Sequence, residues 1–475
     1  MALTTTTAPV ANFGRNIFFT AKAHYTPADE AELLAILREH AGEEIRAVGR
    51  LHCWGEAIRS DGVMIDLQKL NEVVIHREGD VLSANVGAGC QIKHLLAELR
   101  THGLTTMSQG LIKEQTLAGA TATGTHGSGG HSFSHSVQAV RVAHYAAGTD
   151  EPIVEEIAAG LELRAARCSL GCLGIVTQLR VAIRQAYFVE EHFQRYDSLD
   201  SVLDAEQEFP LQQFYFAPWR WDFFAQHRRE VSLPRSWSAP LYRCYWSIGM
   251  DCVFHLVVML LARCLPSAVT KFFYRRVLSW LVPRGWKVVD RSDVQLSMRH
   301  ELFRHIETEL FVTRRHLPAA LEFLSAFLRH ASGEETTLSD AIRRSLQNAE
   351  LWTMWESCSG VYVQHYPLCI RQVLPDETLI SMASGTEPMY SISLISYAAV
   401  NRRQGFFAVA EFLTRAMGLL FQARPHWGKH CPLRPADVPL LYPHWNEFQR
   451  IATQRDPEAR FANAWLKETI LGRSQ

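Results

Sequence analysis

The segment LAGATATGTHGSGGHSFSHS, residues 117–136, contains the densest group of residues suited to a chemical site. Its small side chains let the backbone approach a ligand closely, and successive N–H groups can bind an anion. The segment lacks the Gly-Lys-Ser/Thr of a P-loop, and GAGCQI at residues 87–92 lacks the third glycine of the Rossmann fingerprint. We therefore expect a pyrophosphate here, with a flexible loop as the alternative.

The histidines of this segment, His126, His131 and His135, suggest zinc as a second reading. Their spacing matches no common zinc motif, and no carboxylate or thiol accompanies them within the segment. The sequence therefore predicts no metal site.

A second group of reactive residues is Arg50, His52 and Cys53, within AVGRLHCWGEAIRSDGVMIDLQKL at residues 47–70. The pattern predicts a strand, a tight loop that carries these residues, and another strand. A metal site, a nucleophile, a cofactor anchor and a plain surface loop are the alternatives. Adjacent His and Cys residues cannot easily share one tetrahedral ion, which disfavours a metal. A nucleophilic Cys53 would need a base that the sequence does not place.

Two further segments carry charged groups that could act in catalysis. RPHWGKHCPL, residues 424–433, sets Arg, His and Lys around a Trp and a Gly, which predicts a basic, rigid turn; a solvated turn is the alternative. In RHIETELFVTR, residues 304–314, Glu307 and Glu309 share one face of a predicted strand because strand side chains alternate. A surface ion pair is the alternative for either carboxylate.

The elements that must position these residues change character along the chain. Strands and helices alternate to about residue 185, which predicts an α+β region. A helix is expected in YTPADEAELLAILREHA, capped by Thr26, with Leu33, Leu34 and Leu37 buried. A second helix, QIKHLLAELRTHG, ends at Gly103.

The middle of the chain is rich in Trp, Phe and Tyr. Strands are expected in SGVYVQHYPL and YSISLISYAAV, and a helix in LPAALEFLSAFLRHA. We expect a second α+β domain with an antiparallel sheet, whose aromatic lining suits a substrate pocket. The C-terminal segment is predicted to be mostly helical.

The most apolar segment is residues 249–282, which Asp251, His255 and Arg263 interrupt. Its longest stretch without Asp, Glu, Lys or Arg is residues 252–262, shorter than the ~20 apolar residues of a membrane span. We expect one or two apolar helices that are buried in the core and end in basic residues. A face resting on a membrane and a lid over an apolar substrate are the alternatives.

Composition limits the class of protein. Apolar residues make up 47% of the 475 and charged residues 20%, as in ordinary globular proteins of more than one domain. A net charge of −1 gives no reason to expect nucleic acid as a partner. Ten cysteines without a C-x-x-C pair favour a reduced, cytoplasmic protein. The N-terminus has no apolar region typical of a secretory signal.

In their order along the chain, VGRLHCWGEA, VGAG, KEQTLAGATATGTHGSG, LGCLGIVTQLRV and RPHWGK resemble the vanillyl-alcohol-oxidase-type (PCMH-type) FAD flavoproteins. Within that group they are most similar to the aldonolactone oxidase and alditol oxidase branch. The resemblance implies an α+β fold with a two-subdomain FAD-binding domain at residues 1–185. It further implies a cap domain for the substrate at residues 186–420 and a C-terminal segment, residues 421–475, that returns to the FAD domain.

The resemblance also implies roles for individual residues. The loop 49–54 would wrap the pyrophosphate, and His52 would bond covalently to the flavin C8-methyl. Lys429 would lie close to the isoalloxazine and stabilise the reduced flavin, while Glu307, Glu309 or His426 would take the hydroxyl proton. The full set of implied FAD contacts is Gly49, Arg50, Leu51, His52, Cys53, Trp54, Ser108, Gln109, Gly110, Gln115, Thr116, Gly119, Ala120, Thr123, Gly124, Thr125, His126, Gly127, Gly174, Ile175 and Val176.

The chain departs from the family pattern at two places. His52 is followed by Cys53 where the family usually has Ser. Alditol oxidases carry a Glu-x-Arg pair on a cap strand, whereas neither Glu307 nor Glu309 has an Arg two residues later. The second departure weakens the case for a small sugar.

The implied activity is FAD-dependent oxidation of an alcohol or lactol carbon in an aldonolactone- or polyol-like molecule. The hydride would pass to flavin N5, and O₂ or another acceptor would reoxidise the flavin. One alternative is a flavin oxidase for a larger hydrophobic metabolite of a biosynthetic pathway. Another is a non-catalytic flavin-binding protein attached to the membrane surface.

Overall fold

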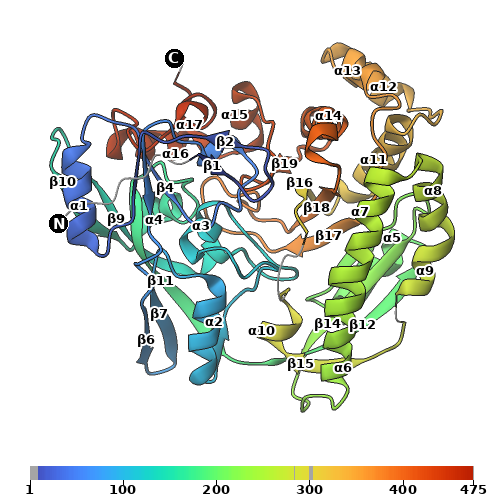
Figure 1. Cartoon of the computed structure of the whole chain (residues 1–475), viewed down its shortest axis with the longest axis horizontal. Coiled ribbons are helices and arrows are strands. Elements are labelled where there is room, and N and C mark those ends of the chain that lie inside the picture. The colour runs from blue at the N-terminus through green and yellow to red at the C-terminus, as the bar shows by residue number, and fades with distance from the viewer. Residues whose placement is uncertain (1–8, 283, 299–302, 474–475) are drawn as a thin grey trace.

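The computed structural model describes residues 9–282, 284–298 and 303–473, so the beginning of the N-terminal segment lies outside the described residues. Figure 1 shows the N-terminal part of the chain beside the C-terminal helices, and the middle of the chain as a separate layered unit on the other side.

The N-terminal part contains three sheets, of which the smallest pairs β1 (Val10–Ala11) with β2 (Phe18–Phe19). A parallel sheet has the order β3 (Ala23–Tyr25), β5 (Val63–Asp66), β4 (Ile45–Val48). An antiparallel sheet has the order β10 (Pro152–Ile157), β9 (Val137–Tyr145), β11 (Ile175–Gln185), β7 (Val81–Gly87), β6 (Val73–Glu78), and β8 (Leu104–Thr106) also pairs with β11. Because β4 and β5 are parallel neighbours, the predicted tight loop is a longer crossover, residues 49–62. Its first residues are free to turn away from the sheet.

Helix α1 (Glu30–Glu39) begins three residues later than expected. Asp29 caps it by accepting a hydrogen bond from the Glu32 N–H, while the Glu32 carboxylate accepts one from the Ala28 N–H. The prediction of Thr26 as the cap was wrong, because this reciprocal pair satisfies the first free donors. The buried residues of α1 are Leu33, Ile36 and Leu37, so Ile36 is buried and not the predicted Leu34. The next helix, α2 (Ile92–Thr101), ends before Gly103, whose φ is +70°.

The middle of the chain forms an antiparallel sheet of eight strands. Their order is β15 (Val288–Arg291), β12 (Phe188–Tyr196), β14 (Phe223–Val231), β13 (Gln213–Phe216), β17 (Leu368–Val373), β18 (Met389–Ser396), β16 (Ile306–Thr313) and β19 (Arg424–Pro425). The helix expected in LPAALEFLSAFLRHA is present as α11 (Leu317–Ala331), and the YSISLISYAAV strand as β18. The strand expected in SGVYVQHYPL is absent over residues 359–367, because Pro367 lacks the N–H that a central strand needs and pairing starts at Leu368.

Helices cover both faces of this sheet. Phe214 and Phe216 pack in one core with α11 and α14 (Gln404–Phe421), whereas Tyr215, between them on the same strand, packs in a second core with α7 (His255–Cys264). The alternation along β13 places the two helical layers on opposite sides. Shorter helices complete the layers: α5 (Leu199–Asp204), α10 (Ser292–Gln295), α12 (Asp340–Asn348) and α13 (Trp352–Ser357).

The apolar segment forms two helical stretches on the β13 face that carries Tyr215. The first, Ala239–Cys264, joins α6 (Ala239–Cys244), the π-helical Tyr245–Phe254 and α7; the second joins α8 (Ser267–Phe272), the π-helical Phe273–Val277 and α9 (Leu278–Leu281). By length and composition the first stretch could cross a membrane, and only 22% of its most apolar window is buried. The expectation of a buried core helix was therefore wrong: one side packs on the sheet and the other is exposed.

The C-terminal segment crosses from the cap sheet to the N-terminal part. Strand β19 pairs with β16, and α15 (Val438–Leu441), α16 (Trp445–Arg455) and α17 (Ala464–Thr469) then share a core with α2, α3 (Leu117–Ala122) and α4 (Gly160–Ala166). This path carries residues 426–429 between the two parts. The division into segments 1–185, 186–420 and 421–475 stays a prediction.

Candidate active site

A cavity of about 260 Å³, cavity 1, lies where the N-terminal part, the cap sheet and the segment 426–429 meet. It is lined by the loop 49–54, the start of α3, the segment 169–176 and β16. Of the residues singled out in the sequence, the following line it: Gly49, Arg50, Leu51, His52, Cys53, Trp54, Gln115, Thr116, Gly119, Thr123, Thr125, His126, Gly174, Val176, Glu307, Glu309, His426 and Lys429.

Seven of the expected FAD contacts lie elsewhere. Ala120 and Ile175 are buried in hydrophobic cores, and Gly110 and Gly124 pack against Phe133 and Met382. A separate cavity of about 40 Å³ is lined by Ser108, Gln109 and Gly127. Their roles as FAD contacts stay predictions.

The wall of cavity 1 is shaped by close backbone approaches. A Cβ on Gly49 would lie 2.4 Å from the Thr116 Oγ1, and Gly174 has φ +128°, with a Cβ position 2.5 Å from the Ala143 carbonyl oxygen. Leu51 adopts φ +56°, which is uncommon for a residue with a side chain. The wall also contains Gln115, whose buried Oε1 has no hydrogen-bond partner within the described residues. A tight cradle with an unsatisfied polar atom fits a large polar cofactor such as FAD.

In the loop 49–54, the imidazole of His52 stacks on Phe13, with ring centroids 4.9 Å apart. Desolvation lowers the pKa of His52 to about 4, so the ring is neutral and keeps a nitrogen lone pair at neutral pH. Desolvation raises the pKa of the Cys53 thiol to about 11. A thiol with so high a pKa is a poor nucleophile, which argues against the catalytic reading of Cys53.

Glu307 and Lys429 form an ion pair in the cavity wall. The Lys429 Nζ lies 2.5 Å from the Glu307 Oε2 and 4.6 Å from the centroid of the Trp54 ring. The backbone holds both partners in place, because the His430 N–H donates to the Glu307 carbonyl oxygen. The alternative of a surface ion pair is excluded for Glu307, whose side chain is 6% exposed.

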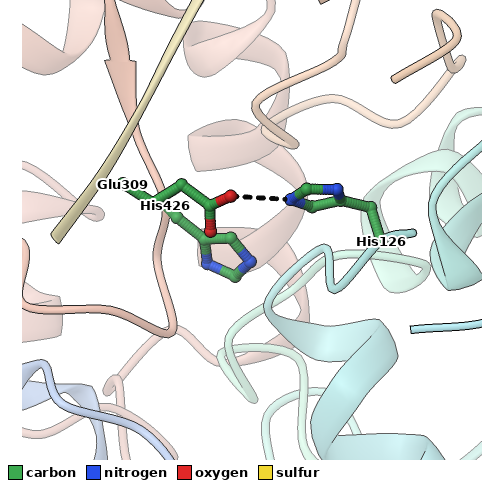
Figure 2. Close-up of side chains that lie close together, drawn as sticks. All are labelled: His126, Glu309 and His426. Carbon is green, nitrogen blue, oxygen red and sulfur yellow. Dashed lines mark ion pairs between the residues drawn. The ribbon is translucent and has the colours of Figure 1, made fainter. Parts of the chain in front are cut away.

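Glu309 lies two residues along β16, between two histidines (Figure 2). The His126 Nε2 is 3.3 Å from the Glu309 Oε1, and one ligand atom from each of Glu309, His126 and His426 lies within 4.8 Å of the others. Burial alone would raise the pKa of the Glu309 carboxyl, but His126, Lys429 and His426 outweigh it and hold that pKa well below its ordinary value. Glu309 is therefore a buried carboxylate.

Hydrogen bonds define the protons on the two histidines. The His126 Nδ1 faces the Gly127 carbonyl oxygen at 2.8 Å, so Nδ1 carries a proton. The other ring nitrogen of His126, Nε2, faces the Glu309 carboxylate. The His426 Nδ1 accepts a hydrogen bond from the Gly428 N–H, and desolvation lowers the pKa of His426 to about 3. His426 is therefore neutral and presents Nε2–H as a donor.

The zinc reading of His126, His131 and His135 is not supported by their positions. The rings of His131 and His135 stack on each other, while His126 turns to Glu309. His126, Glu309 and His426 lie close enough together to ligate a cation, but His426 would first have to give up the hydrogen on Nε2. The RPHWGK segment is not a solvated turn either, since Trp427 and His426 are buried.

Sequence reasoning missed the cap residues that complete cavity 1. Arg371 on β17 is half-buried, and its Nε donates to the Gln213 Oε1 at 3.0 Å. Despite desolvation, Cys369, Glu309 and other neighbouring groups raise the pKa of Arg371 above its ordinary value. A lone Arg within the apolar PLCIRQVL was the available signal. The other missed lining residues include Tyr215, His255, His305, Tyr366 and Tyr397.

A second cavity of about 400 Å³, cavity 2, adjoins cavity 1 in the cap. Tyr242, Trp246, Met250 and Phe254 line it from the Ala239–Cys264 helix, and the β13 and β14 strands form the opposite wall. Five residues line both cavities: Leu111, Tyr215, His255, Met298 and Tyr366. These five residues form the boundary between the two cavities, and cavity 2 lies beyond them from the Glu307 and Glu309 carboxylates.

An α+β frame with this cradle and a cap over buried carboxylates is typical of FAD-dependent oxidoreductases. The profile of a FAD binding domain matches residues 21–149, and that of D-arabinono-1,4-lactone oxidase matches residues 193–469. The chain therefore belongs to the D-arabinono-1,4-lactone oxidase family. It is an FAD-dependent oxidoreductase that acts on CH–OH groups.

Relatives and solved structures agree with this placement. The chain is 49% identical to a long-chain alcohol oxidase of an uncultured marine euryarchaeote, over 96% of this chain and 95% of that protein. It is 26% identical to an L-gulono-1,4-lactone dehydrogenase of Mycobacterium tuberculosis, over 94% and 95%. A cholesterol oxidase from Brevibacterium sterolicum has the same fold, with a TM-score of 0.71 at 13% identity over 98% of this chain and 97% of that one.

Proposed function

We propose that this protein oxidises the hydroxyl-bearing carbon of a long-chain primary alcohol to the aldehyde. The observation that carries the proposal is that cavity 2 adjoins cavity 1, which gives an aliphatic chain a place beyond the carboxylates of Glu307 and Glu309. The 49% identical relative, a long-chain alcohol oxidase, supports the same substrate class. Of the two substrate classes predicted from the sequence, the proposal favours the larger hydrophobic metabolite and not the aldonolactone or polyol.

When bound, FAD accepts the hydride from the alcohol carbon, and O₂ or another acceptor then removes the two electrons. The residues proposed to hold it are those of the loop 49–54, the start of α3 and the segment 174–176. His52 is proposed as its covalent anchor, because a neutral imidazole fixed by Phe13 keeps a lone pair for the C8-methyl carbon. Forming this bond from the His52 imidazole would release one hydrogen from each partner, with O₂ as the two-electron oxidant that becomes hydrogen peroxide.

The chain's own residues are proposed to handle the proton of the substrate hydroxyl. Glu309 is ionised, buried and already in contact with His126, so it can accept this proton as the hydride leaves. His426 is neutral and can donate Nε2–H to the substrate oxygen but cannot act as the base through Nδ1. Lys429 supplies positive charge that stabilises negative charge developing in the cavity.

The alkyl chain is proposed to lie in cavity 2. Its volume falls within the ~300–1,000 Å³ typical of small-molecule sites, and aromatic and aliphatic side chains cover much of its wall. One charged pair in this wall is internally satisfied, since Arg228 binds Glu191 at 2.6 Å and Tyr242 also donates to Glu191.

Two further predictions from the sequence are part of this proposal. We propose the domain division at residues 185 and 420, and a cytoplasmic location with contact to a membrane surface. The rival class, a non-catalytic flavin-binding protein, predicts a bound flavin that no alcohol reduces.

The test is an anaerobic titration of the purified holoenzyme followed at the flavin absorbance band. A detergent-dispersed long-chain primary alcohol should bleach the band, while gulono- and arabinono-lactones and alditols should not. Bleaching by the lactones alone would reject the substrate proposal and leave the family assignment intact. No bleaching by any CH–OH compound would favour the rival class.

A further inference from the structure

The two helical stretches of residues 237–281 expose an unusual amount of apolar surface. They contribute 11 of the 22 large apolar side chains that are exposed in the described residues, although they form a small part of the chain. We call these side chains the apolar face. Its members are Trp237, Leu241, Ile248, Val253, Leu256, Leu260, Leu265, Val269, Phe272, Trp280 and Leu281.

The apolar face and cavity 2 lie on opposite sides of one helix. Tyr242, Trp246, Met250 and Phe254 recur every four residues along its inner side and line cavity 2. The members of the face on this helix are Leu241, Ile248, Val253, Leu256 and Leu260, which occupy other positions along it and are exposed to solvent. A wall one helix thick therefore separates the exterior apolar surface from the proposed alkyl site. Figure 1 shows this helix lying across the β12 and β14 strands.

The tryptophans of the face gather at one end. Trp237 precedes α6 and is 91% exposed, and Trp280 on α9 is 86% exposed. The Tyr245 hydroxyl donates to the Leu281 carbonyl oxygen at 2.5 Å, so the end of α9 returns to the beginning of the long helix. Exposed Trp beside apolar residues is typical of a protein surface at the level of lipid headgroups.

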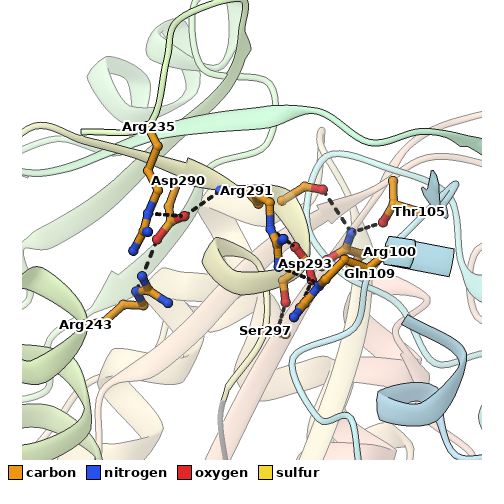
Figure 3. Close-up of polar contacts among 10 residues, drawn as sticks. Arg100, Thr105, Gln109, Arg235, Arg243, Asp290, Arg291, Asp293 and Ser297 are labelled. Carbon is orange, nitrogen blue, oxygen red and sulfur yellow. Dashed lines mark hydrogen bonds and ion pairs between the residues drawn. The ribbon is translucent and has the colours of Figure 1, made fainter. Parts of the chain in front are cut away.

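The charge around the face is positive. Between residues 235 and 287 the only acidic residue is Asp251, whereas eight residues are basic: Arg235, Arg243, Arg263, Lys271, Arg275, Arg276, Arg284 and Lys287. Some are neutralised from outside the segment: Asp290 binds Arg235 and Arg243 (Figure 3), and Glu334 binds Lys271 and Arg275. Arg276 and Lys287 are exposed. This excess complements anionic lipid and disfavours a second copy of the same face.

The helix does not cross a bilayer, because its inner side is committed to the cap. Phe254 and Val258 are buried in a core with Trp219 and Phe224, and the Arg263 Nε donates to the Tyr397 carbonyl oxygen at 2.9 Å. A membrane span would have to give up these contacts.

We propose that the apolar face rests in the headgroup layer of an anionic membrane and that long-chain alcohols pass from the lipid into cavity 2 beside this helix. Attachment of the protein to the membrane does not depend on the reaction, whereas delivery of the alcohol into cavity 2 rests on the proposed function. A lipid surface accounts for three features together: the exposed aliphatic stripe, the clustered tryptophans and the positive rim.

The test is flotation of the holoenzyme with vesicles of equal parts phosphatidylcholine and phosphatidylglycerol. The double variant Trp237→Ser/Trp280→Ser should lower the partition coefficient at least about tenfold, which corresponds to ~1.4 kcal/mol. The matched control is Leu440→Ser/Val400→Ser, which removes exposed apolar side chains elsewhere and should float like the wild type. A wild-type protein that does not float, or a control that falls as far as the double variant, would overturn the proposal.

A second measurement does not depend on a variant that must fold. Cys244 and Cys264 are the exposed cysteines of the described residues, and both lie on this helix. An environment-sensitive dye on these thiols should shift to the blue when vesicles are added. No shift would contradict insertion, and a dimer in sedimentation velocity that the double variant abolishes would assign the face to a second copy.

Delivery is tested separately from attachment. With alcohol embedded in vesicles, the double variant should lose about tenfold in kcat/KM, while its rate with a short, water-soluble alcohol stays that of the wild type. Flotation without reduction by any long-chain alcohol would keep the attachment and reject the proposed function. Equal loss with both alcohols would reject delivery.

Discussion

Replacing Lys429 with Met should destabilise the protein and slow reduction of the flavin. The substitution removes the partner of Glu307, whose side chain is 6% exposed, and a cation 4.6 Å from the Trp54 ring centroid. Removing one partner of a buried ion pair costs ~3–5 kcal/mol, because the other charge stays buried without compensation. Since the Lys429 side chain is itself 15% exposed, we expect the lower end, about 3 kcal/mol.

A double-mutant cycle separates the ion pair from general damage. Glu307→Gln alone also breaks the pair, and Lys429→Met/Glu307→Gln leaves neither charge. The double variant should therefore be more stable than the sum of the single losses predicts, by ~1–3 kcal/mol. Lys429→Arg keeps the charge and should retain most of the stability, which makes it the matched control.

The assay is urea unfolding of each holoenzyme, with the free energy extrapolated to water, together with stopped-flow reduction by the alcohol. Loss of one electrostatic stabiliser should slow reduction ~10²–10³-fold in Lys429→Met. A stability loss below about 1 kcal/mol, or strictly additive losses in the cycle, would show that the pair is not the buried interaction described. A reduction rate equal to that of the wild type would remove Lys429 from the proposed mechanism.

Four further outcomes follow from the site. Glu309→Gln should slow anaerobic flavin reduction ~10²–10⁴-fold, and a wild-type rate would dismiss it as the proton acceptor. Stability should fall as pH drops from ~6.5 toward 4, by up to ~1.4 kcal/mol per pH unit for each histidine concerned. His365 is one such histidine, because desolvation lowers its pKa to about 4 and its Nε2 accepts a hydrogen bond from the Tyr397 N–H. Between pH ~6.5 and ~4 the unfolded chain therefore binds more protons than the folded protein. Urea midpoints that do not change between pH 7 and 5 would contradict this. Acid precipitation should leave the yellow colour in the wild-type pellet but not in His52→Ala, whereas colour released wholly from the wild type would exclude the covalent bond. Ser247→Trp should lower kcat/KM about tenfold for long alcohols but leave it unchanged for short ones, with Ser247→Ala as the control. An equal loss for long and short alcohols would place the alkyl chain of the substrate outside cavity 2.

The glycine-containing wall of cavity 1 could be predicted because its parts are local, while its role in holding FAD stays a prediction. The loop 49–54 and the start of α3 are short, glycine-containing segments whose residues act together through neighbouring backbone. Glu307 and Glu309 were also predictable, since alternation along one strand sets both toward the same side.

The cap residues could not be predicted because they meet through strand order. Arg371 on β17 reaches the Glu309 region only because β18 lies between β17 and β16, an order that sequence spacing does not reveal. His126 belongs to the glycine-rich segment, yet its partner Glu309 lies far along the chain, and only the cap brings them within 3.3 Å. Likewise, the apolar pattern of residues 249–282 predicts a helix buried in the core. The structure differs because the sheet covers only one side of this helix.

The central claim is that the enzyme is built for a long aliphatic alcohol, and the chain-length dependence of flavin reduction tests it most directly. Rate constants and apparent dissociation constants should be measured anaerobically in the stopped flow for a series of primary alcohols from short to long. Filling cavity 2 with successive methylene groups should tighten binding by up to ~0.8 kcal/mol each until the cavity is full, with no further gain beyond it. A dissociation constant independent of chain length, with faster reduction by an aldonolactone, would contradict the account.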